Sequence, residues 1–223
     1  HSTFLAHFSP SGCDDMADNP CHFGLNNMFA ANGLASEDTT TRLYFPADQH
    51  QLRALLERVF EDPGLRFVFT NRSALPDILT GDGAPLYGTG YRFEPGRDDF
   101  VREGKAGYVV SFGETLCRSL DAVERLREKG LDVGLVNKST LNVVDEDAIR
   151  KVGSTGFVLV AEGLSVQTGL GSRFGTWLLE RGLTPRYAHV GTHREGCGGL
   201  GEQMPHQGLD PDSLVARIEK LAG

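Results

Sequence analysis

The sequence contains no apolar run of the roughly 18 residues that a membrane-spanning helix requires, so we expect no membrane partner. It also lacks an excess of basic residues: 22 Lys and Arg stand against 30 Asp and Glu, and the formal net charge is −8. That balance argues against broad binding to nucleic acid or to anionic membranes. The first residues lack a basic segment followed by an apolar core. No signal peptide is therefore predicted, and we expect a cytoplasmic protein.

Cysteine is scarce as well, and the CxxC spacing of zinc sites is missing from the four cysteines, which are Cys13, Cys21, Cys117 and Cys197. A pair or a metal site at Cys13 and Cys21 is one reading, and free thiols in a reducing compartment are the favoured one. There is no initiator Met either, since His1 opens the chain. We interpret the sequence as a fragment or a proteolysed chain.

The first third of the chain contains one strand–helix–strand pattern. Residues 1–36 are rich in small and turn-forming residues, which predicts a loop. A short strand follows at residues 42–45, and Asp48 is placed to cap a helix with one apolar stripe, formed by Leu52, Leu55, Leu56, Val59 and Phe60. A second strand is predicted at residues 66–70. Residues 1–75 therefore form a partial domain of the βαβ type.

Residues 76–106 are rich in Gly, Pro and charge, which predicts a linker between two domains. From residue 107 to residue 223 strands and helices alternate. Strands are expected at 108–112, 133–136, 157–161 and 185–190, and helices at 116–126, 145–152, 170–180 and 210–221. The alternation predicts an α/β fold, with a second domain arranged as a three-layer α/β/α sandwich.

Several segments of the chain resemble transketolases and related thiamine-diphosphate enzymes. The second domain is similar to their C-terminal domain through SFGETLCRSLDAVERLREKGLDVGLVN, FVLVAEG, TGLGSRFGTWLLERG, HVGT and GGLGEQMPHQGLDPDSLVARIEKL. The first domain resembles the second half of their pyrimidine-binding domain through RLYFPADQHQLRALLERVFEDPG and RFVFTNRS. The opening HSTFLAH is similar to a histidine-bearing loop of transketolases and, somewhat more closely, of phosphoketolases.

The resemblance implies catalytic roles for His1 and His7, which match histidines that face the thiazolium and the sugar hydroxyls. It implies that Arg72 contacts a sugar phosphate. These residue types suit those tasks, because histidine titrates near neutral pH and the guanidinium fork binds phosphate in a bidentate way. Residues 8–40 are longer than the corresponding transketolase loop, and Ser2 and Thr3 replace other residues. The substrate therefore stays open.

The cofactor machinery of the family is missing from this sequence. Gly81-Asp82-Gly83 matches the family's Gly-Asp-Gly, but the next Asn is Asn137, far beyond the expected spacing, so we interpret the triplet as a turn. The family's activating glutamate lies upstream of the region covered here. Thiamine diphosphate and Mg²⁺ are therefore expected to be held mostly by an N-terminal cofactor-binding domain or subunit, and no cofactor-binding residue is assigned. The resemblance also implies a homodimer.

No metal site is predicted in this chain, and the glycine-rich connection is interpreted as scaffold. Asp14, Asp15 and Asp18 near His22 are read as turn and cap residues, and His189, His193 and Cys197 lack a ligand spacing. Residues 169–172 lack the full GxGxxG pattern of a dinucleotide site, which favours close strand-to-helix packing.

Three functions remain open at this point. The resemblance favours the C-terminal part of a transketolase-like enzyme that transfers two-carbon ketol units from ketose phosphates, inactive on its own. A phosphoketolase-type lyase is the second possibility. A non-catalytic α/β binding or assembly module is the third, because a fold alone does not decide function.

Overall fold

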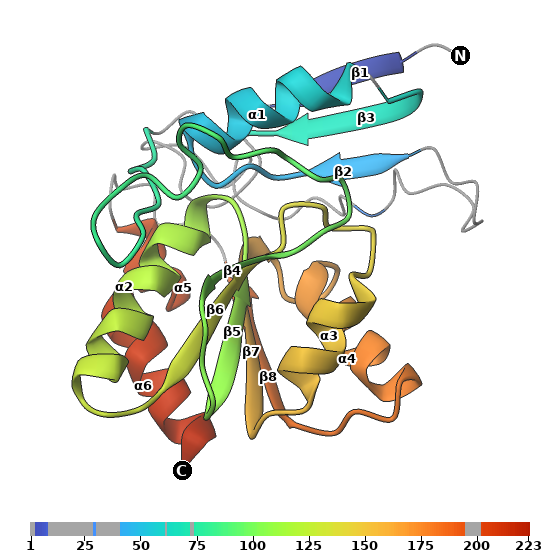
Figure 1. The fold of residues 1–223 in the computed structure, drawn as a ribbon. Helices are drawn as coiled ribbons and strands as arrows, with labels where there is room; N and C mark the ends of the chain where they lie inside the picture. Colours follow the sequence, from blue (N-terminus) through green and yellow to red (C-terminus); the bar gives the residue numbers. More distant parts are fainter. Residues whose placement is uncertain (1–2, 9–28, 30–40, 61, 72–73, 195–201) are drawn as a thin grey trace.

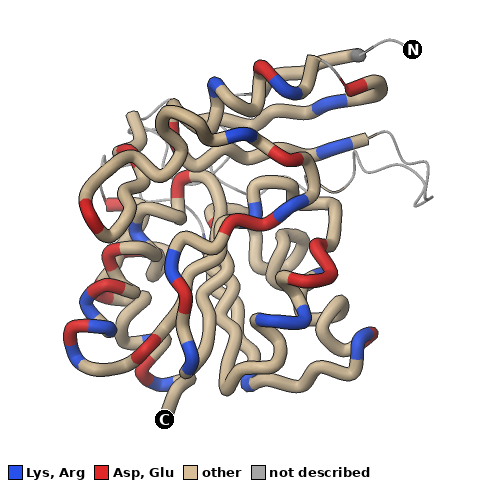
Figure 2. The backbone as a smooth tube through the Cα atoms, in the orientation of Figure 1, with Lys and Arg blue, Asp and Glu red and all other residues tan. Residues whose placement is uncertain are grey.

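The computed structural model describes residues 3–8, 29, 41–60, 62–71, 74–194 and 202–223. Two sheets make up this part of the chain, one of three strands and one of five (Figure 1). Lys, Arg, Asp and Glu are mixed over the outer helices and loops, as Figure 2 shows. No helix among the described residues has both the length and the apolar character needed to cross a membrane.

The smaller sheet is entirely parallel, with the strand order β1-β3-β2. Its strands are β1 (Thr3–Phe8), β2 (Arg42–Tyr44) and β3 (Gly64–Phe69). Helix α1 (Gln49–Val59) begins after Asp48, whose side chain accepts a hydrogen bond from the backbone N–H of Gln51. The helix packs on one face of this sheet through a core that contains Tyr44, Leu55, Val59, Val68 and Phe93. The predicted strand–helix–strand unit is confirmed.

Strand β1 corrects the expectation that the beginning of the chain is loop. Residues 3–8 pair in parallel with β3, so that Leu5 lies beside Arg66 and His7 beside Val68. Six residues give too short an alternation for a reliable strand pattern, and their hydrogen-bond partners lie about 60 residues further along the chain. Local composition could not indicate that pairing.

The larger sheet has the order β4-β6-β5-β7-β8, and all its pairs except β4–β6 are parallel. Its strands are β4 (Asp99–Arg102), β5 (Gly107–Ser111), β6 (Val133–Asn137), β7 (Phe157–Ser165) and β8 (Arg186–Thr192). Helices α2 (Glu114–Glu128), α5 (Gln203–Gln207) and α6 (Pro211–Ala222) lie on one side, and α3 (Glu146–Gly153) and α4 (Leu170–Glu180) on the other (Figure 1). The three-layer α/β/α prediction is confirmed. Helix α5 was not predicted.

Both faces of this sheet are buried, because successive side chains of each strand point to opposite helix layers. On one face Val109, Leu135 and Leu159 pack with Leu116, Leu126, Leu214 and Ile218 of α2 and α6. On the other face Val110, Val136 and Val160 pack with Ile149, Phe174 and Leu178 of α3 and α4. Every residue of β5, β6 and β7 is buried.

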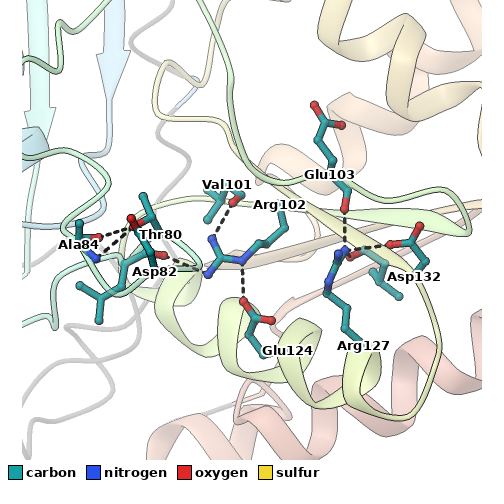
Figure 3. A network of polar contacts seen from close by, with 11 residues as sticks. Thr80, Asp82, Ala84, Val101, Arg102, Glu103, Glu124, Arg127 and Asp132 are labelled. Carbon is teal, nitrogen blue, oxygen red and sulfur yellow. Dashed lines mark hydrogen bonds and ion pairs between the residues drawn. The ribbon is translucent and has the colours of Figure 1, made fainter.

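The segment predicted as a linker also contributes a strand. Within residues 76–106, β4 pairs antiparallel with β6. The charges that hid it from sequence reasoning are paired: Lys138 Nζ lies 3.0 Å from Asp98 Oδ1, with both side chains buried. Figure 3 shows the contacts of Arg102, which donates to Glu124 at 2.5 Å and to the carbonyl of Val101 at 2.8 Å.

The Gly81-Asp82-Gly83 triplet forms an exposed turn, as predicted. The Thr80 side chain donates to Asp82, and the Gly83 N–H donates to the Thr80 carbonyl at 3.0 Å (Figure 3). Gly83 has a φ of 85°, a conformation that favours glycine. The glycines of this triplet therefore serve the turn itself.

Candidate active site

The carboxyl ends of strands from both sheets converge at one junction. The Phe45 N–H, just past β2, donates to the Ser139 carbonyl at 2.8 Å, and the Leu141 N–H donates to the Leu43 carbonyl at 2.9 Å. The segment after β6 therefore runs antiparallel beside β2. Ligands of open parallel sheets bind outside the carboxyl ends of the strands. This junction is therefore the place to look for a functional site.

Three aromatic rings fix the geometry of the junction. Phe45 stacks on Phe69 with ring centroids 4.6 Å apart, and it meets Phe112 edge-on at 5.1 Å. These rings follow β2, end β3 and follow β5, and all three are buried. The smaller sheet is therefore packed firmly against the larger one where their strands end.

His7 lies near the carboxyl end of β1, and its side chain is exposed. Its ring Nε2 lies 2.7 Å from the Thr70 hydroxyl, which follows β3. That hydrogen bond restrains an imidazole that otherwise faces solvent. The ring can therefore meet a bound molecule in a defined orientation. Thr70 was not singled out from the sequence, since its partner is 63 positions away.

The two other predicted site residues, His1 and Arg72, lie outside the described residues. Arg72 directly follows Asn71, so its position along the chain is next to the junction. The functional roles assigned to His1, His7 and Arg72 stay predictions.

Thr70 and Asn71 border a hollow of about 340 Å³ beside the start of α1, which is lined by Pro46, Asp48, Gln49, Leu52, Thr70, Asn71, Ala74 and Leu75. Both carboxylate oxygens of Asp48 are engaged, since they accept from the N–H groups of Gln51 at 2.8 Å and Ile78 at 2.9 Å. Gln49 donates to Asp77 at 3.0 Å. Thr70 and Asn71 are thus the polar groups that this hollow shares with the junction.

Asn71 also connects the smaller sheet to the larger one. Its side-chain N–H donates to a carboxylate oxygen of Glu114, the first residue of α2. Glu114 is 4% exposed. Sequence reasoning missed this pair, and the signal that could have drawn attention to it is a carboxylate directly after a Gly that follows a buried strand.

The glycine-rich connection at residues 169–172 holds a side chain of the chain itself. Glu162 accepts hydrogen bonds from the N–H groups of Leu170 and Gly171, both at 2.7 Å, and so occupies the start of α4. Burial raises the pKa of the Glu162 carboxyl to about 7, although the two backbone N–H donors act in the opposite direction. A Cβ on Gly169 would lie 2.3 Å from a Glu162 oxygen. The interpretation as close strand-to-helix packing is confirmed.

The side chains of the described residues do not fit a metal–diphosphate site. Within residues 3–8, 29, 41–60, 62–71, 74–194 and 202–223, no group of three or more His, Cys, Asp or Glu is placed to hold a metal ion. The acidic cluster at Asp14, Asp15, Asp18 and His22 lies outside these ranges, as does Cys197. Thiamine diphosphate with Mg²⁺ therefore needs groups beyond those described.

Comparison with known proteins gives consistent matches. Residues 96–214 match the family model described as transketolase, C-terminal domain. One of the two subunits of an apulose-4-phosphate transketolase, from Actinobacillus succinogenes, is 25% identical over 209 residues, covering 86% of this chain and 65% of that protein. A transketolase family protein of Sinorhizobium fredii is 35% identical over 209 residues, covering 88% of this chain and 59% of that protein.

A solved structure titled as a split gene transketolase, inactive beta4 tetramer, superposes with a TM-score of 0.81 and 25% identity, covering 99% of this chain and 66% of that chain. The sequence therefore spans about two thirds or less of the length of these relatives.

Proposed function

We propose, from the premise that this chain belongs to the transketolase C-terminal domain family, that it is the C-terminal part of an enzyme that transfers two-carbon ketol units between sugar phosphates. The family is one of thiamine-diphosphate-dependent, transketolase-like enzymes. The assignment of residues 1–75 to a partial pyrimidine-binding-type domain and of residues 107–223 to the C-terminal-type domain is part of the same proposal.

The observation that carries the proposal is the exposed His7 imidazole, held at 2.7 Å from Thr70 beside the hollow at the strand ends. Ketol transfer requires proton movement at sugar hydroxyl oxygens, and histidine suits this because its pKa lies near neutral pH. His7 would give and take these protons, with Thr70 orienting the ring and His1 as a second proton-transfer group. Arg72 would bind the sugar phosphate through its guanidinium fork.

Thiamine diphosphate, when bound, supplies the carbanion chemistry that amino-acid side chains cannot provide. The described residues do not form a site for its metal–diphosphate part. We therefore propose that an N-terminal cofactor-binding partner, either a domain or a separate subunit, holds that part together with Mg²⁺. A relative named as a transketolase subunit and a neighbour titled as a split gene transketolase support a separate subunit. The assembly is proposed to contain two copies of this chain and to act in the cytoplasm.

Co-expression with a cofactor-binding partner that carries the Gly-Asp-Gly and Asn motif tests the proposal. The purified complex is supplied with thiamine diphosphate, Mg²⁺, a ketose phosphate and an aldose phosphate, and the sugar products are separated by chromatography. We expect a ketose phosphate and an aldose phosphate that differ from the substrates by two carbons. Each protein alone should give no exchange.

Two other outcomes would reject this function. Acetyl phosphate formed with inorganic phosphate as the acceptor would identify a phosphoketolase-type lyase. A complex that retains no thiamine diphosphate in the presence of Mg²⁺ would identify a non-catalytic assembly module.

A further inference from the structure

A buried carboxylate of the larger sheet's helix layer reaches the strand end that holds His7. The Asn71 side chain donates to Glu114, and the hydroxyl of the preceding residue, Thr70, lies 2.7 Å from His7 Nε2. Two consecutive residues after β3 therefore make two different connections. One runs to α2 in the second region, and the other runs to the imidazole in the first.

The position of the Glu114 carboxylate is well defined. Glu114 is in the first turn of α2, where the helix dipole favours a negative charge. The residue before it, Gly113, has a φ of 53°, which other residues adopt only with strain. Against Phe45 and Phe112 the remaining hollow at this contact is about 10 Å³, room for about one water molecule. Packing thus leaves the side chain little freedom to move.

We propose that Glu114 is a positioning residue for His7, acting through Asn71 and Thr70. This inference rests on the proposed function for its catalytic meaning, but its structural part can be tested in the chain alone. Loss of the Glu114 carboxylate would release the Asn71 side chain and let the Thr70 backbone shift. The Thr70 hydroxyl would then hold the imidazole less firmly. A displacement of about 1 Å at a reacting group can lower a rate by about 100-fold.

Four variants separate this role from a general effect on folding. Glu114→Ala removes the acceptor, and Glu114→Gln keeps one oxygen that Asn71 can reach. Asn71→Ala breaks the same contact from its half-buried side. Glu128→Ala is the matched control, because Glu128 is exposed in the last turn of the same helix. Thermal unfolding of each variant shows which ones keep the fold.

The first measurement uses the chain alone and follows the ¹⁵N resonances of the His7 ring, assigned by their loss in His7→Gln. We expect the wild type, Glu114→Gln and Glu128→Ala to show one dominant tautomer. Glu114→Ala and Asn71→Ala should show averaged shifts of a free imidazole. Folded variants of both kinds with wild-type His7 resonances would overturn the proposal. If Glu114→Ala does not fold, Asn71→Ala decides alone.

The second measurement uses the complex with the cofactor-binding partner. Glu114→Ala should lower kcat by about tenfold with KM changed by less than about twofold, and Glu114→Gln should recover most of the loss. A kcat equal to that of Glu128→Ala would contradict the positioning role. If the wild-type complex transfers no ketol unit, the proposed function fails, and the ¹⁵N measurement still decides whether Glu114 positions the ring.

Discussion

The two sheets are built from the same parallel strand–helix unit, but they differ in how completely helices cover them. Every residue of β5, β6 and β7 is buried between two helix layers. The smaller sheet has α1 on one face, and its edge strand β1 leaves Phe4 65% exposed. The candidate catalytic side chain, His7, lies on that less covered strand. A rigid region thus supports a more accessible one that carries the reactive group.

The junction between the regions explains how this support works. Phe45, Phe69 and Phe112 pack the strand ends together, and Gln51 of α1 accepts a hydrogen bond from Asn137 of β6 at 3.0 Å. We expect the larger sheet to dominate stability and the smaller sheet to dominate activity.

The largest predicted change in stability comes from the core of the larger sheet. Leu159→Ala, at a fully buried position of β7, should lower the free energy of unfolding by about 2–5 kcal/mol, since it removes apolar contacts and leaves a cavity. Phe4→Ala, on the exposed edge of the smaller sheet, should cost less than about 0.5 kcal/mol. Urea unfolding followed by circular dichroism measures both. Equal costs would remove the contrast between the two regions.

A smaller effect is expected from closing the gap between β8 and α4. A Cβ on Gly171 would lie 2.3 Å from His189 Nδ1 and 2.5 Å from its Cβ, so Gly171→Ala should cost about 1–3 kcal/mol through overpacking. The control is Gly81→Ala in the exposed turn, where a new Cβ meets open space. Thermal unfolding should leave the control within a degree or two of the wild type, on the order expected for a change below about 0.5 kcal/mol.

The buried carboxyl of Glu162 predicts a pH dependence of stability. Its pKa is raised from 4.5 to about 7, so the folded state binds the proton more tightly than the unfolded state. Its contribution to stability is therefore complete below pH 4.5 and is lost as the pH rises through about 7. Urea unfolding between pH 5 and pH 8, on the order of the range set by that shift, should show stability falling as pH rises.

Glu162→Gln, which mimics the protonated form, should flatten this slope. Asp99 remains as a second contributor in the variant, because burial raises the pKa of its carboxyl to about 6. An unchanged slope in Glu162→Gln would show that the carboxyl does not titrate in this window.

The smallest predicted effect concerns the outer helix layer. Arg125 of α2 pairs with Asp212 of α6 at 2.7 Å, but both side chains are well exposed. Arg125→Ala should change the free energy of unfolding by less than about 1 kcal/mol, because water and salt screen exposed pairs. A larger loss in urea unfolding would mean that surface pairs share the stabilising role assigned here to the core.

The larger sheet could be predicted from sequence because its physical pattern is long and local. Residues 157–161 form a continuous apolar run, and Asp145 and Asp210 cap their helices as expected from their positions. Strand β4 escaped prediction because only Phe100 and Val101 are apolar among its four residues. Its charged neighbours are satisfied by Lys138 and Glu124, which come later in the chain.

The candidate site was less predictable, because its contacts are long-range. His7 was identified through the resemblance of HSTFLAH to a family loop, and its role stays a prediction. The Thr70 hydroxyl and the Glu114 carboxylate were not found, since they lie 63 positions from His7 and 43 positions from Asn71 respectively. Only the folded arrangement brings these side chains together.

The most direct test of this account compares two histidines in the complex with the cofactor-binding partner. His7 lies at the strand ends beside the hollow, whereas His50 lies on α1 and contacts Asp77 at 3.3 Å. Removing an essential proton-transfer group typically lowers a rate by about 10²–10⁴-fold. We predict a loss of that size in ketol transfer for His7→Gln, with His50→Gln close to the wild type and both variants unfolding at the wild-type temperature. Full activity in a folded His7→Gln complex would contradict the account.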